Sequence, residues 1–300
     1  MVGVERCLIQ SEQSDATARA VGEWMRRYKV PAYDERTGKG LIRHVYVRTN
    51  RKGETLCCVL ANGKQLPREP ELAAYVRAAA PKTVGVVLGT NTRPGNVILG
   101  EKYRTLWGES CLMDTLCGLT FKLSVPSFYQ VNRDQAEVLY GKALEFAGLT
   151  GAETVLDLYC GTGTITLCLA KQAKKAIGAE IVPPAIEDAK ENAARNNIEN
   201  AEFFCGDAAD IAAKLEREGL RPDVITVDPP RKGLAPEVIA YVAGMGPKRV
   251  VYVSCDPATL GRDVKIFDGF GYKAVRAAAV DMFPGTRHVE TIVLLQRETL

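Results

Sequence analysis

The feature that most constrains this chain is the regular alternation of short apolar runs and helical stretches along its second half. Runs buried on both sides, separated by amphipathic helices, are typical of parallel strands joined by crossover helices. The helical stretches read TITLCLAKQA, PAIEDAKENAARNN, DIAAKLEREG and PEVIAYVAGM. The strand-like runs are 154–160, 175–181, 201–207, 223–229 and 249–255, followed by two more around 272–280 and 288–296. We therefore expect an α/β domain with a doubly wound, Rossmann-like sheet, whose ligand sites lie at the carboxyl ends of the strands.

The first half has a different pattern and predicts a smaller α+β domain. Helices are expected over 11–29 and 70–80, and antiparallel strands over 41–49 and 55–61, 84–90 and 96–103. Turn signals join each pair of strands, at 50–53 and at 93–95. Asn132 followed by Gln135 is a good helix start. We place the domain boundary just before it, giving domains 1–125 and 126–300.

Composition excludes several classes of protein. The 300 residues are 46% hydrophobic and 25% charged, as in an ordinary globular protein. No apolar run approaches the length of a membrane span, and the N-terminus does not read as a signal peptide. Nine cysteines, an odd number without framework spacing, indicate free thiols in a reducing compartment. A cytoplasmic protein with no membrane partner is expected.

Charge is distributed unevenly along the chain. Residues 1–125 carry 19 Lys and Arg against 12 Asp and Glu, a net of +7, whereas residues 126–300 carry 20 against 24, a net of −4. A basic first half suggests contact with a polyanion. The competing interpretation is a solvated surface whose asymmetry is due to chance.

Basic and aromatic side chains gather on the strand at 41–49. Period-two spacing places His44, Tyr46 and Arg48 on one face and Arg43 on the other, with Lys52 in the following turn. Such a face suits a splayed RNA base and its phosphates. The alternative is a half-exposed amphipathic strand without a ligand.

Acidic residues end four successive strands of the second half. They are Asp157, Glu180, Asp207 and Asp228. The first precedes a glycine turn, DLYCGTGT at 157–164, that opens a helix and lets a ligand approach the backbone closely. Singly, each acid has a structural explanation as a helix cap, a surface residue or a turn residue. Together they indicate a cofactor site in which the second carboxylate binds ribose hydroxyls and the third lies near an adenine.

The glycine spacing distinguishes between cofactors. An NAD site requires Gly-x-Gly-x-x-Gly, but the third position here is Thr166. A P-loop is excluded because no Gly-x4-Gly-Lys-Ser/Thr occurs. A row of carboxylates repels a pyrophosphate and attracts the sulfonium and amino groups of S-adenosylmethionine (SAM), which is therefore the expected cofactor.

Cys255 is the candidate nucleophile. It ends the fifth strand and precedes Asp256, a good N-cap, and Pro257, a good first helical residue. A thiol next to a helix N-terminus is expected to have a lowered pKa. The alternative is a small core residue, as we expect for most of the other cysteines.

These motifs together resemble one enzyme family, the RNA uracil-C5 methyltransferases, which make 5-methyluridine in ribosomal or transfer RNA. The resemblance is strong over residues 120–300 and looser before them. The motifs that carry it are FYQVN (128–132), DLYCGTGT (157–164), GAE (178–180), DPPRKGL (228–234), SCDPATLGRD (254–263) and HVET (288–291).

The resemblance implies a role for individual residues. Cys255 would be the nucleophile and Glu290 the general base. Thr164 would lie beside the cofactor, where other family members have Asn. No metal site is expected. The residues implied to contact SAM are Gln130, Tyr159, Glu180 and Asp228, with Asp207 at the adenine.

The chemistry of uracil methylation explains why these residue types are needed. A thiolate that adds to C6 makes C5 nucleophilic, so that C5 can take the methyl group from the sulfonium. A base must then remove the C5 proton before the thiol can leave. Glu290 suits this step if a dry pocket raises its pKa, and His288 is expected on the same strand face, where it could tune the base or touch RNA.

Relatives of this family commonly carry an N-terminal β-barrel and a [4Fe–4S] cluster held by four cysteines. This chain starts after the point at which both would begin, so we expect it to lack the barrel. We also expect no cluster, because only Cys7 matches a cluster ligand and one cysteine cannot hold a cluster. RNA is the implied partner, with ribosomal RNA favoured over transfer RNA. A monomer is expected.

Four other functions agree less well with these residues. Methyltransferases acting on exocyclic amines share the Asp-Pro-Pro motif, but usually with an aromatic residue where Arg231 stands, and they have no use for Cys255 and Glu290. RNA cytosine-C5 enzymes need a second cysteine beside that motif. A non-catalytic RNA-binding module would not need the intact thiol and base. An NAD oxidoreductase is disfavoured by the glycine spacing.

Overall fold

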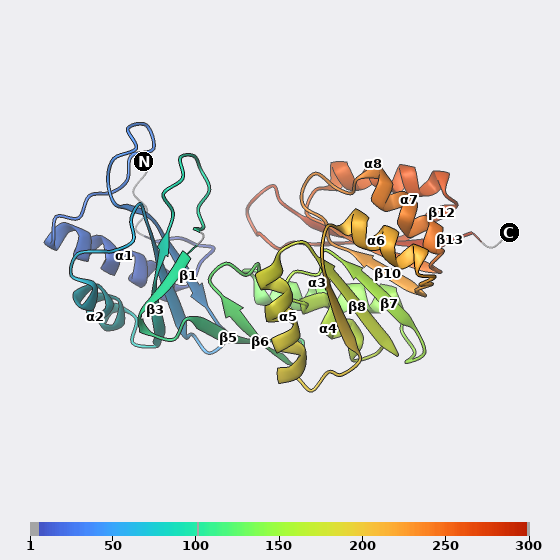
Figure 1. Ribbon diagram of the computed structural model, residues 1–300, viewed down its shortest axis with the longest axis horizontal. Coiled ribbons are helices and arrows are strands. Elements are labelled where there is room, and N and C mark those ends of the chain that lie inside the picture. Colours follow the sequence, from blue (N-terminus) through green and yellow to red (C-terminus); the bar gives the residue numbers. More distant parts are fainter. Residues whose placement is uncertain (1–5, 101, 299–300) are drawn as a thin grey trace. The chain divides into compact units, whose positions relative to one another are not determined.

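The computed structural model describes residues 6–100 and 102–298, in which the chain forms two compact units (Figure 1). The first unit comprises the chain up to Thr115 together with Lys122–Pro126. The second comprises Leu116–Phe121 and Ser127–Leu300. The division into domains 1–125 and 126–300 that the sequence suggests, with one boundary between them, stays a prediction.

The first unit is a four-stranded sheet covered by two helices. The strands lie in the order β1 (Ile42–Thr49), β2 (Thr55–Ala61), β3 (Thr83–Thr90) and β4 (Lys102–Gly108), with helices α1 (Glu12–Arg27) and α2 (Glu69–Ala79). Both helices pack on the sheet and on each other. Trp24 of α1 is fully buried in this core, and its indole N–H donates to the carbonyl of Arg68 at 3.2 Å.

The predicted antiparallel pairing of the first two strands is confirmed by β1 and β2, and β2 and β3, whose relative direction was not predicted, run parallel and are joined by α2. One sequence prediction for this unit is wrong. The predicted strand at 96–103 is mostly loop, and the strand that pairs with β3 begins only at Lys102. The apolar residues that suggested a strand are exposed: Val97 is 61% exposed and Ile98 is 48% exposed.

The second unit has the doubly wound α/β fold that the sequence predicts. Its sheet has the order β12-β13-β11-β10-β7-β8-β9, in which β7 to β11 are parallel and β13 pairs antiparallel with β11 and β12. Figure 1 shows α6, α7 and α8 on one face of the sheet and α3, α4 and α5 on the other. The strands are β7 (Thr154–Leu158), β8 (Lys175–Glu180), β9 (Ala201–Cys205), β10 (Val224–Val227), β11 (Arg249–Ser254), β12 (Tyr272–Val280) and β13 (Glu290–Arg297). The helices are α3 (Arg133–Ala147), α4 (Thr164–Ala170), α5 (Pro183–Arg195), α6 (Ala208–Arg217), α7 (Pro236–Met245) and α8 (Pro257–Gly269).

A two-stranded hairpin, β5 (Cys111–Leu116) and β6 (Leu119–Ser124), precedes α3 along the chain. The sequence analysis did not predict it. Its β6 strand alternates buried and half-buried residues, which is the pattern of a strand with one face packed.

Local sequence fixes where the helices of the second unit begin. Asn132 caps α3 through its side-chain oxygen, which accepts from the backbone N–H of Gln135 at 3.3 Å, as predicted. Asp256 caps α8 by accepting from the N–H groups of Ala258 and Thr259, at 3.0 and 3.2 Å. Because these caps satisfy the first N–H groups of the helices, they fix the loops that connect strand ends to helices.

None of the helices formed by residues 6–100 and 102–298 has the length and apolar character needed to cross a membrane.

Candidate active site

Strand pairing brings three predicted site residues to one edge of the seven-stranded sheet. Val227 of β10 pairs with Tyr252 of β11, and Asp228 is the next residue after β10. In the antiparallel pairing of β11 with β13, Ser254 lies opposite Thr291. Cys255 and Glu290 each lie one residue beyond that pair, so they are neighbours at the end of these strands. The thiol and the two carboxyl groups therefore share one site.

The environment of the Cys255 thiol differs from the prediction. Burial raises its pKa, and the charges of Glu290 and Asp228 raise it further, while Arg231 lowers it. The expected lowering by the helix N-terminus is not found. Asp256 accepts from the first N–H groups of α8, so those groups already have a carboxylate partner.

The carboxyl groups of this site are also shifted. Glu290 is 5% exposed, and burial raises its pKa, with an opposing effect from the charge of Arg231. Burial raises the pKa of Asp228 to about 8, and the charges of Glu290 and Asp157 contribute. Asp228 is therefore mostly protonated at neutral pH, and a cation bound beside these two acids would favour their ionised forms.

The glycine turn at 157–164 has an unusual backbone. Tyr159 has a φ of +68°, a region that residues other than glycine rarely occupy. Gly163 has a φ of +79°, and a Cβ there would lie 3.1 Å from the ring of Phe203. Glu180, at the end of β8, accepts from the N–H of Gly161 at 3.2 Å and from that of Val182 at 3.0 Å. The strand-end acid thus ties the turn to the start of α5.

Asp157 does not face a ligand, although the sequence grouped it with the other strand-end acids. It is 1% exposed, and its two carboxylate oxygens accept from the hydroxyl groups of Thr166 and Thr226, at 2.5 and 2.6 Å. Burial raises its pKa to about 6. Asp157 of β7 therefore connects this strand to α4 and β10 through hydrogen bonds inside the core.

Other predicted cofactor residues lie in different environments. Gln130 is buried, between the exposed side chains of Phe128 and Val131. The Thr164 hydroxyl is 3.2 Å from the hydroxyl of the buried Tyr140.

Tyr159 and Asp207 complete the predicted cofactor set. Tyr159 is half-buried against the core, and burial raises its pKa to about 12. Asp207 is exposed and caps α6, accepting from the N–H of Ala209 at 2.9 Å. Its contact with an adenine stays a prediction, as do the roles of the other site residues.

His288 does not share a strand face with Glu290, because β13 begins at Glu290 itself. The imidazole packs edge-on against Phe283, with ring centroids 6.4 Å apart, and the backbone N–H donates to Thr286 at 3.2 Å. The residue belongs to the loop before β13.

The basic side chains of β1 are largely engaged within the first unit. The Arg43 guanidinium donates to the carbonyls of Asn91, Arg93 and Gly95, at 3.2, 2.6 and 2.8 Å. Arg48 is 8% exposed and lies over the ring of Tyr46. These two arginines therefore do not form the phosphate-binding face that the sequence suggested, whereas Lys52 is exposed.

The sequence analysis did not predict a buried carboxylate beside the site that accepts hydrogen bonds from two distant segments. The carboxylate of Asp263 in α8 is fully buried and accepts from the hydroxyl of Tyr252 at 2.6 Å and from the N–H of Leu234 at 2.8 Å. It joins the DPPRKGL segment to the helix that follows Cys255. The partners are 11 and 29 residues away, so no local pattern reveals them.

No cluster of three or more His, Cys, Asp or Glu side chains suited to a metal ion occurs in the part of the chain that the structure describes. The backbone N–H of Cys7 donates to Asp15 at 3.2 Å.

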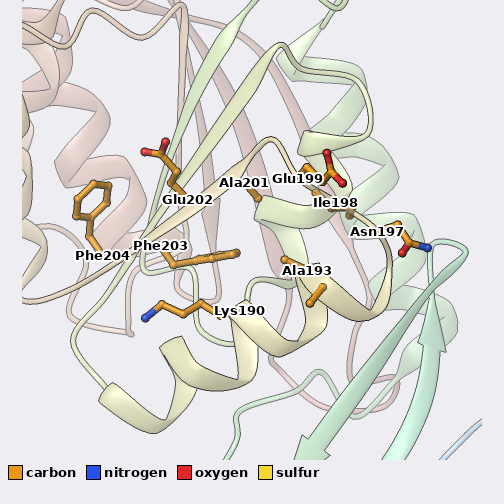
Figure 2. A pocket seen from close by; sticks show the side chains of 10 residues that line it. Lys190, Ala193, Asn197, Ile198, Glu199, Ala201, Glu202, Phe203 and Phe204 are labelled. Atoms are coloured by element: carbon orange, nitrogen blue, oxygen red, sulfur yellow. The ribbon is translucent and has the colours of Figure 1, made fainter.

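A hollow of about 710 Å³ lies between α5 and β9, away from the strand-end site. Figure 2 shows Lys190 and Ala193 of α5 beside the ring of Phe203 of β9, whereas Phe204 points away from them. None of its ten lining residues is a predicted site residue. Phe203 closes its inner side, because its ring lies against Gly163 and Gly178.

Comparison with known proteins adds independent information. A family model described as tRNA (uracil-5-)-methyltransferase matches residues 117–298. The chain is 44% identical over 297 residues to an uncharacterized RNA methyltransferase of Halalkalibacterium halodurans, covering 99% of this chain and 65% of that protein. It is 43% identical over 298 residues to another from Clostridium acetobutylicum, with 99% and 65% covered. The chain thus spans about two thirds of the length of these relatives.

A solved structure is similar over nearly the whole chain. The tRNA (uracil-54, C5)-methyltransferase of Pyrococcus abyssi, in complex with S-adenosyl-L-homocysteine, superposes with a TM-score of 0.82 at 28% identity, covering 98% of this chain and 70% of that one. The fold, the motifs and the family model agree. This chain belongs to the tRNA (uracil-5-)-methyltransferase family.

Proposed function

We propose that this chain transfers a methyl group from SAM to C5 of a uracil in RNA, with Cys255 as the nucleophile and Glu290 as the general base. One observation carries the proposal: a thiol and a buried carboxyl group are neighbours on adjoining strand ends, next to a second carboxyl group. Methylation at C5 requires an enzyme nucleophile that adds to C6 and a base that removes the C5 proton, whereas an amine nitrogen attacks the methyl group itself and needs no covalent nucleophile.

The residues present fit SAM. Asp228 and Glu290 form an acidic pocket that favours a cation, and Glu180 ends the strand where a ribose-binding carboxylate is expected. The Thr162 hydroxyl, in the glycine turn, is buried without a hydrogen-bond partner among the described residues. When bound, SAM supplies an electrophilic methyl group on a positively charged sulfur.

The Cys255 sulfur would open the reaction by forming a bond to C6 of the uracil. The electron pair of the C5–C6 double bond moves toward the O4 carbonyl, which makes C5 an enolate-like carbon. C5 would then form a bond to the methyl carbon while the bond from that carbon to the cofactor sulfur breaks and a neutral thioether leaves. The product of this step is a saturated ring bound to the enzyme through the C6–S bond.

Glu290 would complete the reaction by removing the proton from C5. The electron pair left on C5 re-forms the double bond, the C6–S bond breaks, and Cys255 returns as a thiolate. Burial suits Glu290 to this step because a raised pKa brings a carboxylate closer to neutral pH, where it can accept a proton and give it up again.

The class of RNA is the finer part of the proposal. The family description and the name of the Pyrococcus enzyme both specify tRNA. Transfer RNA is therefore the first substrate to test, ahead of the ribosomal RNA favoured by the sequence analysis.

The test is mass spectrometry of RNA from cells with and without this gene. Loss of 5-methyluridine from one uridine of tRNA or rRNA is expected on deletion. The gene for wild type or for the control variant Cys7→Ala should restore it, and Cys255→Ala should not. Unchanged 5-methyluridine in all RNA fractions would refute the proposal.

A further inference from the structure

The segment after Asp228 is fastened to the helix that follows the candidate nucleophile. The hydroxyl of Thr259, in the first turn of α8, shares its one hydrogen between the carbonyls of Arg231, at 3.2 Å, and Asp256, at 3.1 Å. One turn later, the guanidinium of Arg262 donates to the carbonyl of Lys232 at 2.9 Å. Two successive turns of α8 therefore contact two consecutive backbone carbonyls, those of Arg231 and Lys232.

Asp263 is the centre of this attachment. One carboxylate oxygen accepts from the Tyr252 hydroxyl and from the N–H of Leu234, and the other lies 2.7 Å from the Arg262 guanidinium. The carboxylate is fully buried, so a lost partner would leave a buried charge uncompensated. β11, α8 and the 231–234 segment thus meet at one side chain.

Gly233 allows this close approach. Its φ is +75°, and a Cβ at this position would lie 2.5 Å from a carboxylate oxygen of Asp263. Any larger residue would push the segment away from α8. Gly219 has a similar φ of +81°, but a Cβ added there would meet no atom within 4 Å, so it offers a matched control.

Arg231 is the charged residue that this arrangement holds in place. Its backbone carbonyl lies against the first turn of α8, the helix that directly follows Cys255, and its side chain is exposed. Its positive charge lowers the pKa of both the Cys255 thiol and the Glu290 carboxyl group. The charged groups that face Cys255 are Glu290 from β13, Asp228 from the end of β10, and Arg231. Arg231 is the cation in this set, and it opposes the two acids.

We propose that Arg231 supplies the positive charge that favours the thiolate of Cys255, and that Asp263 is a positioning residue that holds the Arg231 segment against α8. The purpose of this arrangement rests on the proposed function, because a thiolate is needed only if Cys255 attacks a substrate. The electrostatic claim itself concerns residues of this chain and can be tested without RNA.

The experiment measures the rate at which iodoacetamide alkylates Cys255 as a function of pH, by mass spectrometry of the Cys255 peptide. The thiolate sulfur forms a bond to the CH₂ carbon, the C–I bond breaks, iodide leaves, and the thiol proton goes to solvent. The rate below the thiol pKa therefore reports the thiolate fraction. Arg231→Gln should shift the pH profile upward and slow alkylation at pH 7.5 by about three- to tenfold, since one pKa unit is about tenfold in thiolate. Arg231→Lys should restore most of the rate.

Positioning is tested by a second pair of variants. Gly233→Ala should shift the profile in the same direction as Arg231→Gln, whereas Gly219→Ala should leave it in place. Asp263→Asn should shift the pH profile in the same direction as Gly233→Ala. If the Asp263→Asn protein does not fold, Tyr252→Phe replaces it, because that change removes only one of the hydrogen-bond donors to Asp263.

A pH profile that is the same in Arg231→Gln as in wild type would overturn the electrostatic role. A profile shifted equally by Gly219→Ala and Gly233→Ala would overturn the positioning role. Either result can occur whether or not the chain methylates uracil, so failure of this inference is distinguishable from failure of the proposed function.

Discussion

Glu290 lies beside Cys255 at the end of the neighbouring antiparallel strand, where its carboxyl group adds to the effect of burial in raising the pKa of the thiol. The base that the reaction needs last therefore disfavours the thiolate that it needs first. Positive charge must offset this effect. Arg231 supplies part of it, and the sulfonium of SAM is suited to supply more, so we expect cofactor binding to precede attack on the uracil.

Replacing Glu180 should weaken SAM binding far more than it weakens the fold. Charge-assisted hydrogen bonds contribute about 1.5–3 kcal/mol each, so Glu180→Gln should lower SAM affinity by roughly tenfold or more. Calorimetry measures the affinity, and melting temperature checks the fold. The control is Glu187→Gln, an exposed acid of α5 paired with Lys190. Equal affinities for the Glu180 and Glu187 variants would contradict a cofactor role for Glu180.

SAM binding near neutral pH should release a proton. The pKa of Asp228 is raised to about 8 by burial, Glu290 and Asp157, so this carboxyl group is mostly protonated at pH 7. A bound cation favours the ionised form, so binding should expel about nine-tenths of a proton at pH 7 and almost none at pH 9.5 from this group. Calorimetry in buffers of different ionisation enthalpy measures the release. The pH 7 release should disappear in Asp228→Asn, and a release that persists there would assign the proton to another group.

Stability should respond to pH through Asp157. Its folded-state pKa is raised to about 6, so its favourable contribution is complete below the unfolded-state pKa near 4 and is lost as pH rises through 6. Asp157→Asn cannot ionise. The stability of wild type relative to this variant should therefore fall by roughly 2.5 kcal/mol between pH 4 and pH 8. Melting temperatures of both proteins across this range provide the test, and a constant difference between them would show that Asp157 does not titrate in this way.

Sequence periodicity was enough to predict the second unit, because most of its strands are buried apolar runs and most of its helices begin at a recognisable signal. The strand β12 is largely exposed, yet its run was predicted with its bounds, 272–280. The first unit was harder because one of its apolar runs lies in a loop. The 96–103 run is apolar but exposed, and period alone cannot distinguish an exposed apolar loop from a strand.

Side-chain direction at strand ends was the main limit on predicting the site. Asp157 and Asp228 both follow the pattern of a strand-end acid, yet Asp157 points into the core, where two threonine hydroxyls bind it. Likewise, the hydrogen bonds of Asp263 come from Tyr252 and Leu234, which are distant from it in the sequence. Cys255 and Glu290 were found because the family motifs mark both residues, and the antiparallel pairing of β11 and β13 explains why the two motifs belong together.

Covalent trapping tests the central claim most directly. Glu290→Gln should still allow thiol addition and methyl transfer but not removal of the C5 proton, so a methylated protein–RNA adduct should accumulate and survive a denaturing gel. RNA with 5-fluorouridine at the target should trap wild type in the same way, because fluorine cannot leave as a cation. The adduct should be absent in the Cys255→Ala, Glu290→Gln double variant and present in the Cys7→Ala, Glu290→Gln control. The absence of any adduct with both traps, or an adduct that persists without Cys255, would contradict the mechanism.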